Sequence, residues 1–477
     1  MSLDLGTGSN KLSLANVANT GTVSNVNTLI GGSAADIVTL ATVASNASVD
    51  LGAGNDKLTL ANGTNAISIA NVETVAGGSG ADTVTLSAAA ANASIDLGAG
   101  NDTLTLGNFA NTATLGNVET VTGGTGADAI TLATTLTTAM QIDLGGGSNK
   151  LTLASGGNTG TVSNVGTLIG GSGADAITLA TALTAGSVDL GAGNDTLTLA
   201  NATNTATVAN VETFTGGTGA DTLTLSAAAA NASIDLGTGN NTLTFGNFSN
   251  TATLANVQTV TGGTGNDTLT LSTALTTGMA VDLGAGSDKL TLANVANTGT
   301  IKNVETILGG TANDTLTLGA AAANASIDLG TGSNTLTLGN FANTATLANV
   351  GTITGGSGAD TVTLGSTLTT AMAVDLGGGA NQLSLAAGGN PGTVSNIGTL
   401  IGGSGADAIT LATAITAGSV DLGAGNDTLT LANATNTATV ANVAVLCSNY
   451  HQRHTGVMAM VYRGNFTPSP VARFFHL

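Results

Sequence analysis

The chain has 477 residues, of which 70 are glycine, 2% are aromatic and 8% are charged, and its formal net charge is −20. So few large side chains argue against a conventional globular core, and the 42% of patterned apolar residues argues against disorder. The negative charge disfavours nucleic acid and anionic lipid as partners and favours cations, and no stretch is long and apolar enough to predict a transmembrane segment.

From the N-terminus onward, the tripeptide Asp-Leu-Gly recurs every 46 or 47 residues, and ten such repeats cover residues 4–443. A second, Gly-Gly turn follows within each repeat, as in GGSGADTVTL from Gly77, so we expect two coils per repeat. Between the turns, stretches such as TLTL and TVTL alternate with period two, which predicts short strands with Leu, Val and Ile inward and Thr outward. Because one pair of short strands is unstable in water, stacking is required. The sequence therefore predicts an all-β parallel β-solenoid of about twenty coils.

One asparagine in each repeat, from Asn25 to Asn442, precedes an aliphatic residue and is expected to stack on its equivalents as a structural amide ladder. The acidic residues also occur at only a few positions of the repeat. All 24 aspartates lie in the glycine turns, and the four glutamates share one position, in NVET or its equivalent. Confinement of a short carboxylate to glycine turns indicates a local role, because acids that serve only solubility would be scattered.

The glycine turns offer oxygen ligands. Successive glycines let the backbone turn its carbonyls toward a common point, and a short Asp side chain adds a carboxylate. Calcium accepts six to eight such oxygens. Stacking places equivalent carboxylates about 5 Å apart, where they repel, and a divalent cation between neighbouring turns would convert this repulsion into coordination. We therefore predict that Ca²⁺ binding is coupled to folding.

The turns GGSGADTVT, GGTGADTLT and GGTGNDTLT match the nonapeptide G-G-x-G-x-D-x-U-x, so residues 4–443 resemble the RTX, or haemolysin-type, calcium-binding repeats of secreted bacterial proteins. The resemblance implies a right-handed parallel β-roll with calcium between successive turns. It also implies an extracellular or cell-surface location reached by type I secretion, which agrees with the absence of a signal-peptide pattern at the N-terminus.

The resemblance assigns the metal-ligand role to the last aspartate of each matching turn. In the Gly-Gly series these residues are Asp36, Asp82, Asp128, Asp175, Asp221, Asp267, Asp314, Asp360 and Asp407, and in the Asp-Leu-Gly series they are Asp56, Asp102, Asp195, Asp288 and Asp427. The chain departs from the family because its motifs are 20 or 26 residues apart, which implies calcium along one edge only. The last Asp is replaced in five turns, which are expected to be weak or empty sites: Asn10, Asn149, Asn241, Asn334 and Asn381.

No catalytic constellation is present in the repeats, which contain neither His nor Cys, so we do not expect an enzyme. The expected function is a calcium-binding structural or adhesive segment, with cell-surface glycans or neighbouring surface proteins as possible partners. Two alternatives remain open. One is a metal-free solenoid whose aspartates cap their turns, and the other is an ice-binding face built from the outward Thr rows, which Lys57 and Lys150 interrupt.

Residues 444–477 break the pattern and form a basic tail that contains every Arg and His and the single cysteine, Cys447. Such an abrupt change of composition predicts a disordered or out-of-frame tail that leaves the last coil uncapped. One cysteine cannot form a disulfide within the chain.

Overall fold

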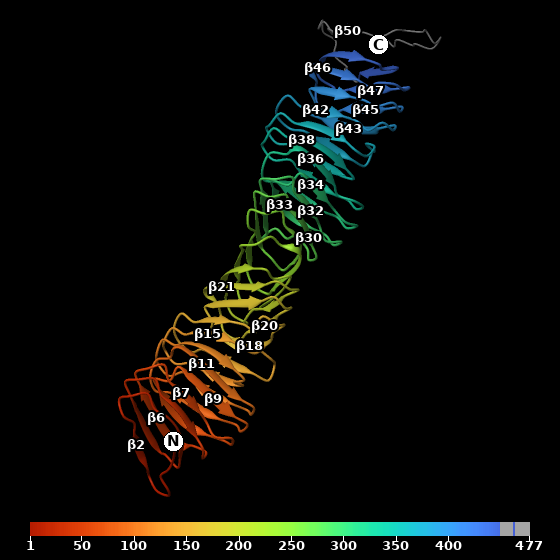
Figure 1. Cartoon of the computed structure of the whole chain (residues 1–477). Helices are drawn as coiled ribbons and strands as arrows, with labels where there is room; N and C mark the ends of the chain where they lie inside the picture. The colour runs from red at the N-terminus through yellow and green to blue at the C-terminus, as the bar shows by residue number, and fades with distance from the viewer. Residues whose placement is uncertain (449–460, 463–477) are drawn as a thin grey trace. The chain divides into compact units, whose positions relative to one another are not determined.

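The computed structural model describes residues 1–448 and 461–462, and these residues contain fifty β-strands and no helix (Figure 1). The chain divides into two compact parts. The first part comprises Met1–Gly246 with Ala255–Val257, and the second comprises Asn247–Leu254 with Gln258–Leu477. Each part is a solenoid of stacked parallel strands, as predicted.

Five types of strand follow one another in the same order in every repeat. The DLG strands lead into the Asp-Leu-Gly tripeptide: β1 (Ser2–Asp4), β6 (Ser45–Gly52), β11 (Ala91–Gly98), β16 (Gln141–Asp143), β21 (Thr184–Gly191), β26 (Ala230–Gly237), β31 (Ala280–Gly284), β36 (Ala323–Asp328), β41 (Ala373–Asp375) and β46 (Thr416–Asp421). The post-DLG strands come next: β2 (Lys11–Ser13), β7 (Lys57–Thr59), β12 (Thr103–Thr105), β17 (Lys150–Thr152), β22 (Thr196–Thr198), β27 (Thr242–Thr244), β32 (Lys289–Thr291), β37 (Thr335–Thr337), β42 (Gln382–Ser384) and β47 (Thr428–Leu431).

The third type, the NV strands, precedes an Asn-Val or Asn-Ile pair: β3 (Thr20–Ser24), β8 (Ala66–Ala70), β13 (Thr112–Gly116), β18 (Thr159–Ser163), β23 (Thr205–Ala209), β28 (Thr251–Ala255), β33 (Thr298–Lys302), β38 (Thr344–Ala348), β43 (Pro391–Ser395) and β48 (Thr437–Ala441). The GG strands lead into the Gly-Gly turn: β4 (Thr28–Gly32), β9 (Thr74–Gly78), β14 (Thr120–Thr122), β19 (Thr167–Gly171), β24 (Thr213–Gly217), β29 (Thr259–Gly263), β34 (Thr306–Leu308), β39 (Thr352–Thr354) and β44 (Thr399–Ile401), with β49 (Val445–Ser448) in the same place of the last repeat.

The post-GG strands complete the repeat: β5 (Ile37–Leu40), β10 (Thr83–Leu86), β15 (Ala129–Leu132), β20 (Ala176–Leu179), β25 (Thr222–Leu225), β30 (Thr268–Leu271), β35 (Thr315–Leu318), β40 (Thr361–Leu364) and β45 (Ala408–Leu411), with β50 (Val461–Tyr462) in the equivalent place at the end. Each turn is named below after the strand that precedes it.

Successive strands lie in opposite sheets. In the first part β8, β10 and β12 are parallel neighbours in one sheet, and β9, β11 and β13 are parallel neighbours in the other. In the second part β28 pairs with β30 and β29 with β31 in the same manner. Two consecutive strands therefore make one coil.

The prediction of two coils per repeat is wrong, because each repeat contributes five strands and hence two and a half coils. The half coil moves each motif to the other sheet in the next repeat. Among the DLG strands of the first part, β6 and β16 lie in the even-numbered sheet and β11 and β21 in the odd-numbered sheet. Both edges of the solenoid consequently carry DLG and GG turns, so the expectation of one acidic edge is also wrong.

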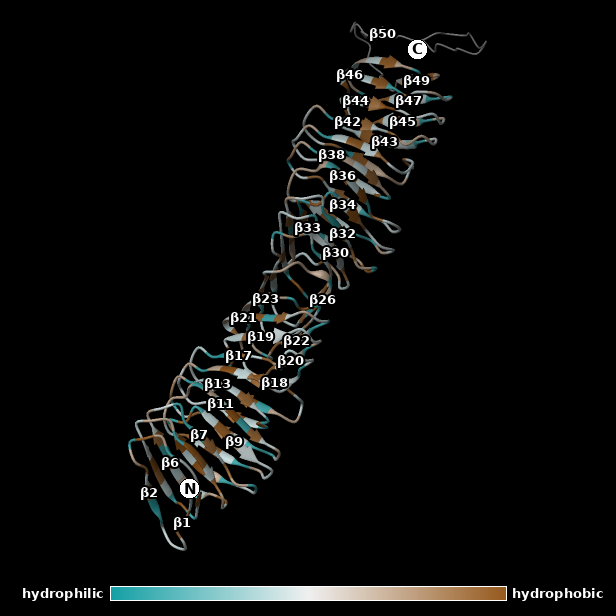
Figure 2. Cartoon of the chain, viewed as in Figure 1, coloured by the Kyte–Doolittle hydropathy of each residue, from teal (hydrophilic) through white to brown (hydrophobic). Residues whose placement is uncertain are grey.

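The period-two pattern is confirmed at the level of burial. In β12 the side chain of Leu104 is buried and the flanking threonines are half-buried, and the same alternation recurs in β25 and β38. The core is a narrow interior of Leu, Ile and Val, with Phe214 as its largest fully buried side chain. Figure 2 shows the apolar positions along the strands of both sheets.

The solenoid continues past the last recognisable repeat. Residues 445–448 pair with β47 in register, from Thr428 with Val445 to Leu431 with Ser448, and Val461–Tyr462 pairs with β48. The strand ladder therefore extends beyond the expected boundary at residue 443. Apart from these strands, the predicted disorder of the 444–477 tail lies outside the described residues.

Candidate metal-binding turns

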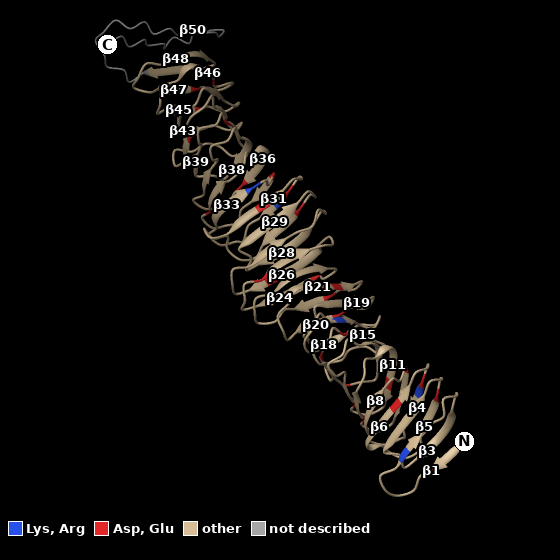
Figure 3. Ribbon diagram, turned by 90° about the vertical axis from the view of Figure 1, so that its left-hand side faces the viewer, with Lys and Arg blue, Asp and Glu red and all other residues tan. Residues whose placement is uncertain are grey.

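The fourteen predicted calcium ligands all lie at the end of a GG or DLG turn, immediately before the next strand. Their side chains are directed into the solenoid, since each is at most 1% exposed: Asp36, Asp56, Asp82, Asp102, Asp128, Asp175, Asp195, Asp221, Asp267, Asp288, Asp314, Asp360, Asp407 and Asp427. Figure 3 shows the acidic residues concentrated where strands end. The carboxylates are thus inside the turns and not on an outer rim.

Hydrogen bonds join these side chains from coil to coil. Asn65 donates its backbone N–H and its side-chain amide to Oδ1 of Asp82, over 2.9 and 2.8 Å. The backbone N–H of Asp82 then donates to Oδ1 of Asp102, and the N–H of Asp102 donates to Oε2 of Glu119, over 2.6 and 2.8 Å respectively. A polar ladder of Asn, Asp, Asp and Glu therefore runs through four successive coils along one edge.

The second carboxylate oxygen of the predicted ligands has no partner. Oδ2 is buried without a hydrogen bond in thirteen of the fourteen residues, all except Asp407, whose Oδ2 accepts the N–H of Gly403 over 3.4 Å. A buried carboxylate oxygen without a donor is costly, and it calls for a proton or a cation. The residues chosen from the motif are therefore the residues that need a further partner.

The five DLG turns that end in asparagine show what surrounds this position. Oδ1 of Asn149 accepts the N–H of Asp128, as Asp102 does for Asp82, so the second branch of the side chain is the amide nitrogen. That nitrogen donates to the carbonyl oxygens of Leu144 and Asn164 over 3.0 and 2.9 Å, with Gly145 and Gly146 at 3.2 and 3.3 Å. In the DLG turns that end in aspartate, Oδ1 makes the equivalent bond, as in Asp102, and the second branch is Oδ2, which has no donor.

This arrangement fits a hard cation in its donor chemistry, because carboxylate and carbonyl oxygens are the ligands that Ca²⁺ prefers. It is not a cluster of acids around one point. Within the described residues, no three His, Cys, Asp or Glu side chains converge as a metal-binding group. Backbone carbonyls would have to supply most of the ligands.

Burial raises the pKa of every aspartate that ends a DLG turn. Desolvation is the main cause for Asp56, Asp102, Asp195 and Asp427, and the negative charge of the GG-turn aspartate in the preceding coil adds to it. For Asp288 the same effects, together with the charge of Glu305, raise the pKa to about 6. These carboxyl groups are therefore unfavourable as anions unless a positive charge accompanies them.

The sequence reasoning missed the asparagine that closes each post-DLG turn. In every repeat except the first, where Asn19 is half-buried, these side chains are at most 6% exposed and hold the ladder together: Asn65, Asn111, Asn158, Asn204, Asn250, Asn297, Asn343, Asn390 and Asn436. Asn65, for example, donates to the carbonyl oxygens of Ala61 and Gly63 as well as to Asp82. Its recurrence at the repeat period immediately before the NV strand was the available signal.

The expected amide ladder from Asn25 to Asn442 is wrong in its contacts. Equivalent turns are not adjacent, because two and a half coils separate them, so these asparagines cannot stack on one another. Asn71, with φ of 51°, instead donates to Oδ1 of Asp50, the opening aspartate of the DLG turn one coil away, over 2.8 Å. The same oxygen accepts the N–H of Gly52, which fixes the turn.

The glycines serve close stacking of coils as well as turn geometry. A Cβ on Gly77 would lie 2.0 Å from the carbonyl oxygen of Leu97 in the neighbouring coil. Gly98 has φ of 86°, and a Cβ there would lie 2.2 Å from the carbonyl oxygen of Gly78. The backbones of GG and DLG turns are therefore packed directly against each other.

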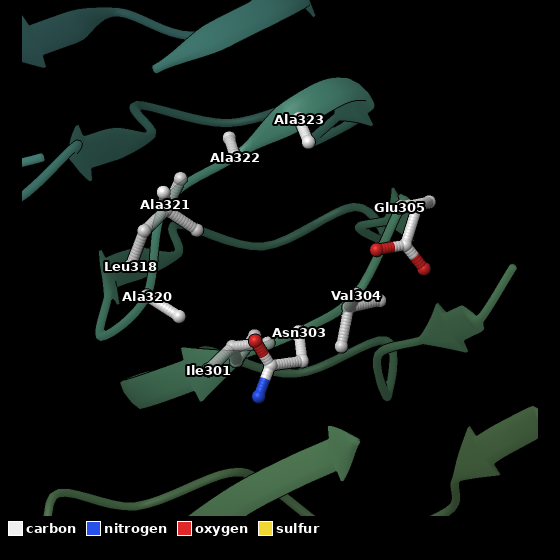
Figure 4. Close-up of a pocket in the computed structure, with 9 residues that line it drawn as sticks. All are labelled: Ile301, Asn303, Val304, Glu305, Leu318, Ala320, Ala321, Ala322 and Ala323. Atoms are coloured by element: carbon white, nitrogen blue, oxygen red, sulfur yellow. The ribbon is translucent and has the colours of Figure 1, made fainter. Parts of the chain in front are cut away.

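The hollows found on the described surface are small. The one in Figure 4 lies where the loop 320–322 and Ala323, the first residue of β36, stack on the turn after β33, and Glu305 is at its rim. The outward rows of the sheets are also mixed, since Ile37, Lys57 and Thr74 occupy consecutive places. No helix of the described residues could cross a membrane.

Comparisons with known proteins supply no family. No protein-family model and no curated protein matches the chain. Among solved structures, the chain is similar to a hyperactive, Ca²⁺-dependent, β-helical antifreeze protein from an Antarctic bacterium, with 20% identity over 70% of this chain and 79% of that chain. The TM-score is 0.14, so this likeness carries no argument about function.

Proposed function

We propose that the chain is a calcium-stabilised structural β-solenoid of the RTX kind, working as a scaffold or adhesive segment outside the bacterial cell. It has no enzymatic activity in this proposal. Cell-surface glycans or neighbouring surface proteins are the proposed partners of its exposed sheets, because long regular strand arrays offer repeated contacts.

One observation carries the calcium proposal: thirteen of the fourteen aspartates at the motif's ligand position have a buried Oδ2 without a partner. A metal-free solenoid would leave each of these oxygens unsatisfied or protonated. Calcium bound to the folded turns stabilises the fold by mass action, because the unfolded chain lacks the assembled oxygens.

The test is thermal unfolding followed by circular dichroism, on protein freed of metal and then titrated with CaCl₂, with MgCl₂ as a control. We expect Ca²⁺ to raise the midpoint steeply. Mg²⁺ should have a smaller effect, because it requires near-octahedral geometry and releases its water reluctantly. An unchanged midpoint at millimolar Ca²⁺ would leave the metal-free structural solenoid as the better account.

A further inference from the structure

Nine of the ten DLG turns are of two kinds, which differ in charge. In four of them the terminal residue is Asp and a Glu follows 17 residues later, in the stacked turn of the next coil. Together with the GG-turn aspartate of the preceding coil, these residues form acidic trios: Asp36–Asp56–Glu73, Asp82–Asp102–Glu119, Asp175–Asp195–Glu212 and Asp267–Asp288–Glu305.

In the five DLG turns that end in Asn, the residue 17 positions later is never acidic: Asn27, Gly166, Gln258, Gly351 and Gly398. In these nine DLG turns the terminal aspartate and the glutamate occur together or not at all. The turns that end in Asn, called amide turns below, keep at most the single charge of the GG-turn aspartate. The remaining DLG aspartate, Asp427, has Ala444 at the glutamate position and so belongs to a turn with two acids.

The amide turn shows that the fold does not require these acids. The side-chain amide of Asn149 donates to turn carbonyls, whereas Oδ2 of Asp102, at the equivalent position of its turn in the sequence, is buried with no partner. If Asp102 were neutralised by a proton alone, the carboxylate of Glu119 stacked beside it would only add repulsion. Replacing a neutral amide by two stacked acids is favourable where a cation neutralises both.

The glutamate of each trio lies where it can contribute to cation binding. Oε2 of Glu119 accepts the N–H of Asp102, which fixes its carboxylate against the DLG turn, and the side chain is half-buried. Glu305 has the same bond to Asp288 over 2.8 Å, and it borders the hollow of Figure 4, so its carboxylate is reachable from solvent.

We infer that the chain has two classes of calcium site, and that the four turns with acidic trios are the tight class. The buried Oδ2 of the DLG aspartate binds the ion together with backbone carbonyls, and the charges one coil away on either side raise the affinity, including those of Glu73, Glu119, Glu212 and Glu305, which lie outside the nonapeptide motif. Affinity for Ca²⁺ rises with the negative charge that the site supplies, so turns with one or two acids form the weak class. This inference rests on the proposed calcium function and adds which turns bind and how many bind tightly.

The experiment converts one kind of turn into the other, using only residues that the chain already places there. Asp102→Asn with Glu119→Gly makes an amide turn from a trio, and Asn149→Asp with Gly166→Glu makes a trio from an amide turn. Calorimetric titration with CaCl₂ should give about four tight sites for the unaltered chain, at least tenfold tighter than the rest. It should give about three for the first variant and about five for the second.

A charge-matched control is Asp143→Asn with Asp235→Asn, which removes two exposed acids that open turns ending in Asn, away from the trios, and should leave the number of tight sites unchanged. If Ca²⁺ binds but the tight-site number is the same in both converted variants, the assignment to the trios is wrong and the general calcium function stands. If the unaltered chain binds no Ca²⁺, the proposed function fails and this inference with it.

Discussion

At the scale of the residue, the carboxyl group of Asp288 links calcium, protons and stability. Its pKa is raised to about 6 in the fold, from an ordinary value of 3.8, because it is desolvated and lies beside Asp267 and Glu305. A group whose folded pKa is higher than its unfolded pKa binds protons preferentially in the folded state. Protonation therefore stabilises the fold as the pH falls through about 6 toward 4, and this stabilisation is absent at pH 8.

We accordingly predict that, without calcium, the thermal midpoint of the unaltered chain rises between pH 8 and pH 5 by more than that of the variant Asp288→Asn, whose amide cannot titrate. The replacement is compatible with the fold, because Asn149 occupies the equivalent position. Saturating Ca²⁺ should abolish the relative gain, since the bound cation replaces the proton. Parallel pH profiles of the two proteins in the absence of calcium would contradict the assignment.

Some residues of the candidate site could be predicted from the sequence, and others could not. The position of Asp82 in its turn was predictable from the motif, and its unpartnered Oδ2 supports the choice. Its neighbours in the ladder, Asn65 and Glu119, were not predictable as neighbours. They come from turns 17 residues before Asp82 and 37 residues after it, and only the stacking order brings them into one ladder.

At the scale of the element, coil contacts depend on the first glycine of the GG turn. Gly77 lies against Leu97 of β11, where a Cβ would approach the carbonyl oxygen to 2.0 Å. Backbone atoms cannot move aside without breaking the strand ladder. We therefore predict that Gly77→Ala destabilises the chain by about 1–3 kcal/mol, the usual cost of overpacking.

The matched control is Gly278→Ala, because nothing lies within 4 Å of a Cβ at Gly278. Its effect should stay within about 0.5 kcal/mol. Urea unfolding of both variants under the same calcium concentration measures the difference. Equal midpoints for the two variants would show that the coils can separate at the GG turn without cost.

Strand type and direction of the side chains followed from period two, but the number of coils per repeat did not. The sequence shows two glycine turns in every repeat, whereas the chain also reverses at the post-DLG, NV and post-GG turns, where a Gly-Gly pair occurs only at 156–157 and 388–389. Reading only the glycine turns therefore gave two coils in place of two and a half. The prediction of a single acidic edge was wrong for the same reason. Because each repeat has an odd number of strands, equivalent turns of successive repeats lie on alternate edges.

At the scale of the whole molecule, the five turn types stack in a fixed order along each edge. Within the first part, a post-DLG turn is followed by a GG turn, a DLG turn, an NV turn and a post-GG turn, as Asn65, Asp82, Asp102 and Glu119 show. This post-GG turn is followed by the post-DLG turn of the next repeat. Leu136 of the post-GG turn donates its N–H to Oδ1 of Asn158 in that post-DLG turn. Each polar group is thus satisfied only by a turn of the correct type.

This order predicts that deleting a whole repeat destabilises the chain less than deleting a single coil. Deleting residues 97–143 removes one whole repeat and rejoins Asp96 to Leu144, so every remaining turn keeps a neighbour of the correct type. Deleting only residues 103–119 removes one coil, and Asp128 then loses Asn111, which donates to it over 3.0 and 2.8 Å. Each buried polar group left without a partner costs about 1–3 kcal/mol, so the shorter deletion should give the lower midpoint in thermal unfolding with calcium present. If the two midpoints instead follow chain length, the order of the turns does not determine stability.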